Sequence, residues 1–134
     1  MAGFFTLESG TDVRAAFADL AIVSEIKPVD LTEGTGDTVL LGQRIRPVIR
    51  LQRRHDSDLS LFVWHKLVVS GSIPAACRNC TITAFDAEGR RLARYELDQA
   101  WPSRIDVGPI ADSPSGELLE TVTLICDDVR RVTL

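Results

Sequence analysis

Two cysteines spaced as Cys77-x-x-Cys80 form the pattern in this chain that most resembles a metal or redox site. A structural zinc ion needs four ligands, and a redox-active pair of this spacing opens a helix after a strand. The third cysteine, Cys126, stands alone, and the two histidines follow no ligand spacing. The pair also precedes the β-branched run that begins at Thr81. We therefore expect two small residues at the start of a strand, reduced thiols and no stoichiometric metal.

Histidine and arginine side chains offer the other candidate chemistry, which is catalysis or phosphate binding. His65 has no serine or cysteine nucleophile motif near it, so we expect a partly buried or interfacial histidine. Five arginines within residues 44–54 could bind phosphate, but their alternation fits a solvated strand face or salt bridges between subunits. The formal net charge of −4 also argues against nucleic-acid recognition. The sequence thus predicts no catalytic, cofactor-binding or metal site, and no enzyme.

Most of the chain shows the alternation of apolar and polar residues that is typical of strands. The clearest alternation covers residues 43–54 and contains Pro47, which a strand accepts at an edge or a bulge. Residues 80–97 predict a hairpin that turns at Asp86–Gly89. Further strands are expected at residues 3–9 and 117–129, loops at 33–42 and 108–116, and a helix at the alanine-rich residues 12–27.

Residues 55–71 predict the one convincing helix. Asp56 or Ser57 is expected to cap its first turn, and Gly71 to end it. Apolar residues cover nearly all sides of this helix, whereas the sheet of a small domain covers only one, so a subunit interface is expected. We expect Trp64 to anchor the helix to its own sheet or to a neighbouring subunit. The two apolar stripes are Leu59, Phe62, Val63 and Leu67, and Leu61, Trp64 and Val68.

Length and composition indicate one globular domain that spans residues 1–134. The chain is 45% hydrophobic and 25% charged, which is typical of a water-soluble domain with a real core. No run approaches the ~20 apolar residues that a membrane helix needs, and the first residues have no signal-peptide features. The sequence predicts a mainly β fold, an antiparallel β-sandwich or barrel with one packed α-helix.

The Ala100-Trp101-Pro102 element interrupts the strand that leaves the hairpin. Proline cannot donate a ladder hydrogen bond, so we expect the ladder to end at Pro102 and a second extended run at Arg104–Val107. Trp101 would fill the resulting corner, where burial of its indole contributes about 2–3 kcal/mol.

Four segments together resemble one known family, that of the tail tube proteins of contractile phages and of extracellular contractile injection systems, which is related in fold to the type VI secretion tube protein. FTLESGTDVRAAFADLAIVSEIKPVD is similar to its first strands, and VIRLQRRHDSDLSLFVWHKLVVSG to its strand with Leu-x-Arg, here ending in Arg53, and the following helix. CTITAFDAEGRRLARYELDQAWPSRIDVGPI is similar to its hairpin and Ala-Trp-Pro, and GELLETVTLICDDVRRV to its closing strand. The chain departs from the family pattern at Arg54, where glycine is frequent, and at Asp19 and Ala21.

The resemblance implies extended chain and strands, in place of the helix, at residues 12–27. It implies hexameric rings whose strands join edge to edge around a lumen and which stack into the inner tube of a contractile machine. Implied partners are other copies of the chain, a sheath protein, baseplate or spike proteins, and cargo or DNA in the lumen. The candidate structural and interface residues are Arg53, Leu61, Trp64, Val68, Trp101 and Pro102.

The implied site of assembly is the cytoplasm, followed by incorporation into a phage tail or a tail-like particle that can be released from the cell. Two other functions stay open from the residues alone. The nearer is a tube-initiator or baseplate-proximal paralogue, and the more distant is a small β-barrel module that binds a ligand.

Overall fold

The computed structural model of the protein describes residues 3–10, 13–32, 38–56, 58–110 and 116–134, and for residues 27–32 and 38–44 it describes the backbone. Within this part of the chain the secondary structure is mainly strand, with two short helices, α1 (Ser60–Val69) and α2 (Ile73–Ala76). The strands are β1 (Phe4–Ser9), β2 (Val13–Phe17), β3 (Asp19–Val23), β4 (Ile26–Thr32), β5 (Thr38–Arg44), β6 (Val48–Arg54), β7 (Arg78–Phe85), β8 (Arg91–Pro109), β9 (Leu118–Ile125) and β10 (Asp128–Val132).

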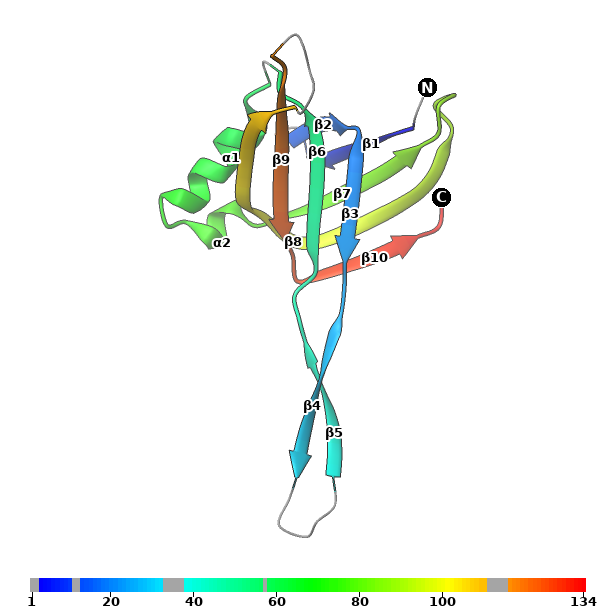
Figure 1. The fold of residues 1–134 in the computed structure, drawn as a ribbon, viewed down its shortest axis with the longest axis vertical. Coiled ribbons are helices and arrows are strands. Elements are labelled where there is room, and N and C mark those ends of the chain that lie inside the picture. Colours follow the sequence, from blue (N-terminus) through cyan, green and yellow to red (C-terminus); the bar gives the residue numbers. More distant parts are fainter. Residues whose placement is uncertain (1–2, 11–12, 33–37, 57, 111–115) are drawn as a thin grey trace.

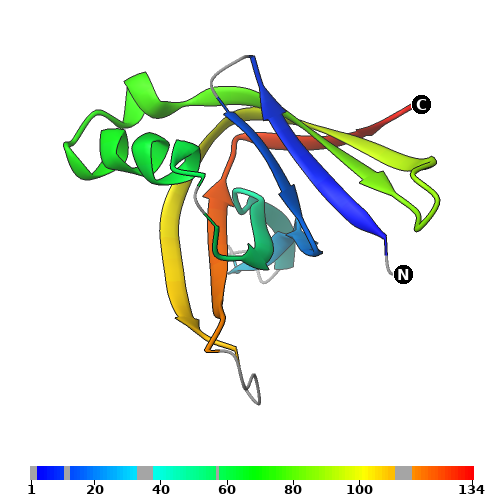
Figure 2. The ribbon, with the colours of Figure 1, turned by 90° about the horizontal axis from the view of Figure 1, so that it is seen from above.

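The strands form two antiparallel layers that share β8 (Figures 1 and 2). Layer 1 has the order β2-β1-β7-β8, with β10 paired to the other side of β8. Layer 2 has the order β8-β9-β6-β3. The predicted antiparallel β fold is therefore confirmed, and it carries a second short helix, α2, that the sequence analysis did not predict.

Strand β8 passes from one layer into the other at the Ala-Trp-Pro element. It pairs with β7 as far as Ala100 and with β9 from Trp101 onward. Gln99, just before the change of partner, has a positive φ of 52°, and the register shifts between Pro102 and Arg104. The expected end of the ladder at Pro102 is thus wrong, although the change of direction is correct. Proline is tolerated because this half of β8 is an edge strand with a bulge.

Strands β2 and β3 and the start of β4 stand where a helix is predicted at residues 12–27, of which residue 12 lies outside the described part. In β2 the buried residues are Val13, Ala15 and Phe17, which alternate with exposed Arg14 and Ala16. This period of two buries one face of a strand, and it outweighs the weak helix preference of the alanines. The extended chain implied by the family resemblance is confirmed here.

Strands β4 and β5 form a separate two-stranded hairpin, the arm, which projects from the lower end of the layers (Figure 1). The loop predicted at residues 33–42 is therefore wrong for residues 38–42, and residues 33–37 lie outside the described part. The strand predicted at 43–54 is divided, because residues 45–47 separate β5 from β6. The loop predicted at 108–116 begins later, because β8 continues to Pro109 and residues 111–115 are not described.

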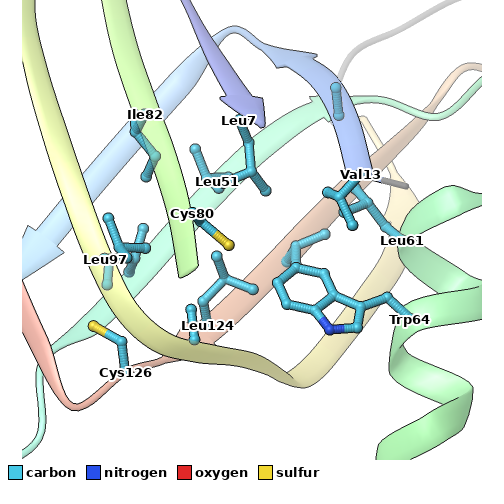
Figure 3. Packing of buried hydrophobic residues seen from close by; sticks show 14 of the residues in the cluster. Leu7, Val13, Leu51, Leu61, Trp64, Cys80, Ile82, Leu97, Leu124 and Cys126 are labelled. Atoms are coloured by element: carbon cyan, nitrogen blue, oxygen red, sulfur yellow. The ribbon is translucent and has the colours of Figure 1, made fainter. Parts of the chain in front are cut away.

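The core lies between the two layers and beneath α1 (Figure 3). Apolar side chains from both layers meet there, and their exposed fraction is near zero. Cys80 and Cys126 belong to this core, as two more small apolar groups. The most central members are Leu7, Ile49, Leu51, Leu61, Trp64, Ile82, Leu97, Val122 and Leu124.

Candidate subunit-interface surfaces

Helix α1 is fastened to the rest of its own chain by the stripe that contains Trp64. Leu61 and Trp64 are both essentially fully buried, and the indole Nε1 donates a hydrogen bond of 2.6 Å to the Ala76 carbonyl of α2. Val68 is partly buried against the same core. This stripe therefore lies inside the subunit. Of the two anchoring roles expected for Trp64, the structure shows the one in which it anchors α1 to its own chain.

The start of α1 differs from the predicted cap. The helix begins at Ser60, and Leu59 in the N-cap position makes no side-chain cap hydrogen bond. Instead Asp58 accepts a hydrogen bond from the Ser60 backbone N–H at 3.0 Å. The alternative cap, Ser57, lies outside the described residues. Gly71, with φ of 87°, follows the helix end as predicted.

A histidine on α1 contacts the bend of β8. The Nδ1–H of His65 donates a hydrogen bond of 2.8 Å to the Pro102 carbonyl, which can only accept, so this nitrogen carries the proton. Pro102 is buried, and Trp101 is half-buried against the core. The structure thus brings together three residues that the sequence singled out separately, and His65 is half-buried, as expected.

An apolar patch lies on the side of α1 that faces away from the core. Leu59 and Val63 are 66% and 64% exposed, and Phe62 is 36% exposed. Two strand residues, Val107 of β8 and Leu118 of β9, sit at core-facing positions of layer 2 yet remain about 40% exposed. We call these five residues the α1 patch. Core-facing side chains that stay exposed show that no described residue covers this edge of layer 2.

Beside the α1 patch lies a buried cluster of charges centred on Arg53. The Arg53 side chain is 6% exposed, its Nε donates to Glu120 Oε2 at 2.5 Å, and its Nη1 donates to Asp58 at 3.1 Å. Its guanidinium carbon also lies 5.4 Å from the centre of the Phe17 ring. His55 Nδ1 approaches the other oxygen of Glu120 at 3.4 Å. Arg53 is thus an internal anchor between β6, β9 and the start of α1.

Electrostatics of this cluster favour the charged forms of Asp58 and Arg53. The hydrogen bonds from Ser60 and Arg53 hold the pKa of Asp58 below its ordinary value, despite the opposing effect of burial. The carboxylates of Glu120 and Asp58 raise the pKa of Arg53, and they outweigh the desolvation that would lower it. Arg53 therefore stays protonated, and the start of α1 is tied electrostatically to the core.

Layer 2 has two free edges and one uncovered face. Within the described residues, β3 and the second half of β8 each have a strand neighbour on one side only. The face away from the core is polar and forms an open groove of about 620 Å³. Its lining residues are Val48, Arg50, Gln52, Ser103, Arg104, Asp106, Thr121, Thr123 and Ile125.

Cys80 and Cys126 are buried thiols of the core. Burial raises the pKa of both Cys80 and Cys126 to about 11, so these thiols stay protonated at neutral pH. Cys77 follows α2 directly, at the entrance to β7. Across the described residues, no three histidine, cysteine or acidic side chains converge as metal ligands. No helix in that part of the chain is long and apolar enough to span a membrane.

Sequence reasoning missed Glu120, although a signal for it was present. In β9 the buried positions are Glu120, Val122 and Leu124, so the acid stands on the apolar face. In β6 the same alternation leads from Leu51 to Arg53. An acid and a base on the inward faces of two strands indicate a buried ion pair, because an unpaired charge there would be too costly.

Comparison with known proteins places this fold in a family. The sequence matches the family model described as T4-like virus tail tube protein gp19 over residues 3–130. A search of curated protein sequences finds no match.

Solved structures share the fold at low sequence identity. A chain of the PVC sheath–tube complex, from an extracellular contractile injection system in the extended state, has a TM-score of 0.68 and 19% identity, over 97% of this chain and 88% of that chain. A chain of the six-fold symmetrised anti-feeding prophage baseplate has a TM-score of 0.68 and 15% identity, over 98% and 92%. Hcp1 from Flavobacterium johnsoniae has a TM-score of 0.59 and 12% identity, over 96% and 94%.

The match over residues 3–130 covers nearly the whole chain, and the antiparallel layers, α1 and the bend of β8 agree with the family resemblance of the four sequence segments. The protein thus belongs to the family of the T4-like virus tail tube protein gp19, and it is a structural protein of a tail tube.

Proposed function

We propose that six copies of this protein close into a ring through the free edges of layer 2, and that rings stack into the inner tube of a contractile injection system or contractile phage tail. The observation that carries the proposal is the combination of two free strand edges with a core left open at one of them. Exposed edges of this kind invite pairing with another chain, and a closed barrel removes them. The six-fold symmetry of the anti-feeding prophage baseplate, which contains a chain of similar fold, supports the number of copies.

The strand order of layer 2 suits closure into a ring. Its four strands, β8-β9-β6-β3, alternate in direction, so the two edge strands run antiparallel to each other. The β8 edge of one copy can therefore continue the antiparallel ladder on the β3 edge of the next. Six copies would give a barrel of about 24 strands. Every neighbouring pair of strands in this barrel, including the pairs between copies, would be antiparallel.

The α1 patch would be covered by the same contact. Its strand members, Val107 and Leu118, face the interior at this end of layer 2. Phe62 lies beside them, because its ring meets the His55 ring edge-on and the His55 backbone N–H donates to the Leu118 carbonyl. A neighbouring β3, which carries Leu20 and Ile22 on its core-facing side, would extend the core across the joint. Burial of apolar area contributes roughly 25 cal/mol per Å², so covering this patch would favour assembly.

The polar face of layer 2 would then line the lumen. Layer 1 and α1 cover the opposite side of layer 2, so in a closed barrel they lie outside, where a sheath can contact them. The lumen wall would consist mainly of short hydroxyl and amide side chains, Arg50 and the Arg104–Asp106 ion pair, whose atoms lie 2.8 Å apart. Val48 and Ile125 are its apolar members. Such a wall suits passage of hydrated cargo. Assembly would take place in the cytoplasm, before incorporation into a tail or a tail-like particle.

Electron microscopy with light scattering tests the proposal. The wild-type protein should give hexameric rings and hollow tubes at high concentration. Val63→Asp, in the α1 patch, should leave the fold intact and prevent rings. Leu92→Asp, at a similarly exposed position on layer 1, should still assemble. A strictly monomeric wild-type protein across salt and concentration would refute the ring. Rings that never elongate would favour the tube-initiator role instead.

A further inference from the structure

The free edge of β8 presents the backbone groups of two core-facing residues. In an antiparallel pair, the backbone groups of successive residues point alternately toward the partner strand and away from it. The Ile110 N–H donates to the Glu117 carbonyl at 3.0 Å, and this contact continues the β8–β9 register. The even-numbered residues of this half of β8 therefore direct their N–H and C=O toward β9. Ile105 and Val107 direct theirs to the free edge, where Pro109 offers a carbonyl alone.

The free edge of β3 presents a matching pair of residues. The His55 N–H donates to the Leu118 carbonyl at 2.9 Å and continues the β6–β9 register. The odd-numbered residues of β6 therefore point toward β9, and the even-numbered ones toward β3. Even-numbered residues of β6 pair with odd-numbered residues of β3. Leu20 and Ile22 of β3 thus direct their N–H and C=O to the free edge, and both side chains pack against the core.

We propose that neighbouring copies in the ring join in one register, in which Leu20 lies opposite Val107 of the next copy. Ile22 then lies opposite Ile105. The inference rests on the ring proposed above, and it specifies the joint between its subunits. Both residues on each edge exchange ladder hydrogen bonds in this register, because their backbone groups point toward each other. All four side chains lie on the core-facing side, so the core of one copy continues into the next.

A slip of the joint by two residues in either direction loses one of these pairs. In one direction Leu20 would face Pro109, which has no N–H to donate. In the other direction one pair would fall on the bulge of β8, and Asp19 would face Asp106. Two like charges directly opposite on one face destabilise a strand pair. Asp19 faces Gly108 in the proposed register, so backbone and charge favour the same arrangement.

The register also sets the tilt of the strands in the barrel. Within one copy, a row of paired residues runs straight from Asp106 through Thr121 and Gln52 to Asp19. Because Asp19 then lies opposite Gly108 of the next copy, each copy displaces the row by two residues. Six copies displace it by about 12 residues, or roughly 40 Å, over a circumference of roughly 115 Å at the usual rise and spacing of strands. The strands should therefore tilt by about 20°, whereas the two slipped registers give no tilt or about 35°.

Paired cysteines on the lumen-facing side test the register. Ala21→Cys with Asp106→Cys places two thiols directly opposite each other across the joint, with Cα atoms about 4.5 Å apart, which suits a disulfide. Either slip moves these positions to about 7–8 Å, which a disulfide does not bridge. The slipped registers instead align Ala21→Cys with Arg104→Cys or with Gly108→Cys, and these combinations are the matched controls. A Cβ on Gly108 meets no atom within 4 Å.

The disulfides report contacts between copies, because β3 and the second half of β8 lie on opposite sides of layer 2 (Figure 1). Every variant also carries Cys77→Ser, since the other two native thiols are buried. On non-reducing electrophoresis of oxidised rings, the combination of Ala21→Cys and Asp106→Cys should give covalent oligomers up to the hexamer. Both controls should remain mainly monomeric. Stronger cross-linking of either control, or equal cross-linking of all three, would overturn the register.

Electron microscopy separates this inference from the proposed function. Cryo-electron microscopy of wild-type tubes should show strands tilted by about 20° from the tube axis. Under reducing conditions the cysteine variants should form the same rings as the wild type, because the changed positions line the open face. Normal rings that never form the expected disulfide would overturn the register alone. Absence of rings from the wild type would overturn the proposed function, and this inference with it.

Discussion

At the scale of single residues, Arg53 shows how a motif residue can serve the interior rather than a partner. Its side chain contacts Glu120 and Asp58 and lies over Phe17, so it joins β6, β9, β2 and the start of α1. Removing one member of a buried ion pair leaves an uncompensated charge, whereas removing both does not. The pair therefore specifies how the helix is seated, even though its net contribution to stability is small.

Arg53→Met should destabilise the fold strongly, because Glu120 would remain buried without its partner. We expect a loss of about 3–5 kcal/mol in the free energy of unfolding, measured by chemical denaturation. The double variant with Glu120→Leu should recover most of that loss. Equal stability of wild type and Arg53→Met would show that water reaches Glu120 and that the pair is not buried.

Asp58 should make the protein sensitive to acid. Its pKa in the folded state is lowered, so its contribution is complete above the ordinary value of about 4 and is lost as the pH falls through the folded value. The melting temperature of Asp58→Asn should therefore fall less than that of the wild type when the pH is lowered from 7 to 3. Parallel melting curves for both proteins over this range would contradict the coupling of Asp58 to Ser60 and Arg53.

At the scale of elements, α1 is held by its inner stripe, and the corner of β8 is held by α1. Trp64→Ala should cost about 3–5 kcal/mol in unfolding free energy, because it opens a cavity in the core and leaves the Ala76 carbonyl without its donor. Trp101→Ala should cost clearly less, since its indole is only half-buried. Thermal unfolding of both variants measures the difference, and the reverse order would refute this account.

Elements whose residues alternate against a core could be predicted from the sequence, and the others could not. The strands at 48–54, 80–85 and 118–125 each bury one face, and their patterns show it. The helix expected at 12–27 failed because alanine suits a small buried position in a strand as well as it suits a helix. The sequence predicts a loop at residues 33–42, which include the first part of β5, because the glycines there suggest turns and no core imposes an alternating pattern.

The candidate interface was only partly predictable, for a related reason. A helix that is apolar on nearly all sides must be buried on nearly all sides. The sequence alone does not tell which of its two stripes packs against its own chain and which remains exposed. Leu61 and Trp64 turned out to be internal, whereas the exposed members are Leu59, Phe62 and Val63. The contribution of Val107 and Leu118 depends on where layer 2 ends, and this follows from strand order rather than from local pattern.

At the scale of the whole molecule, the arm makes a free subunit longer than a compact chain. A compact domain of this length has a radius of gyration of about 14 Å. Small-angle X-ray scattering on monomeric protein, such as Val63→Asp, should give a clearly larger value. The same protein with an Asn-Gly turn in place of residues 27–43, which joins the paired neighbours Ile26 and Arg44, should come closer to about 14 Å. Equal values for the two proteins would show that the arm folds back onto the layers.

The direction of the strands in layer 2 has a mechanical consequence. Strands β3, β6 and β9 run along the longest axis of the molecule, and the arm continues β3 and precedes β6 along the same line (Figure 1). A pull on the arm along this axis therefore loads the β3–β6 and β6–β9 ladders in shear, so that their hydrogen bonds share the force. A sideways pull would peel β3 away one bond at a time. The subunit should accordingly resist axial force far better than lateral force.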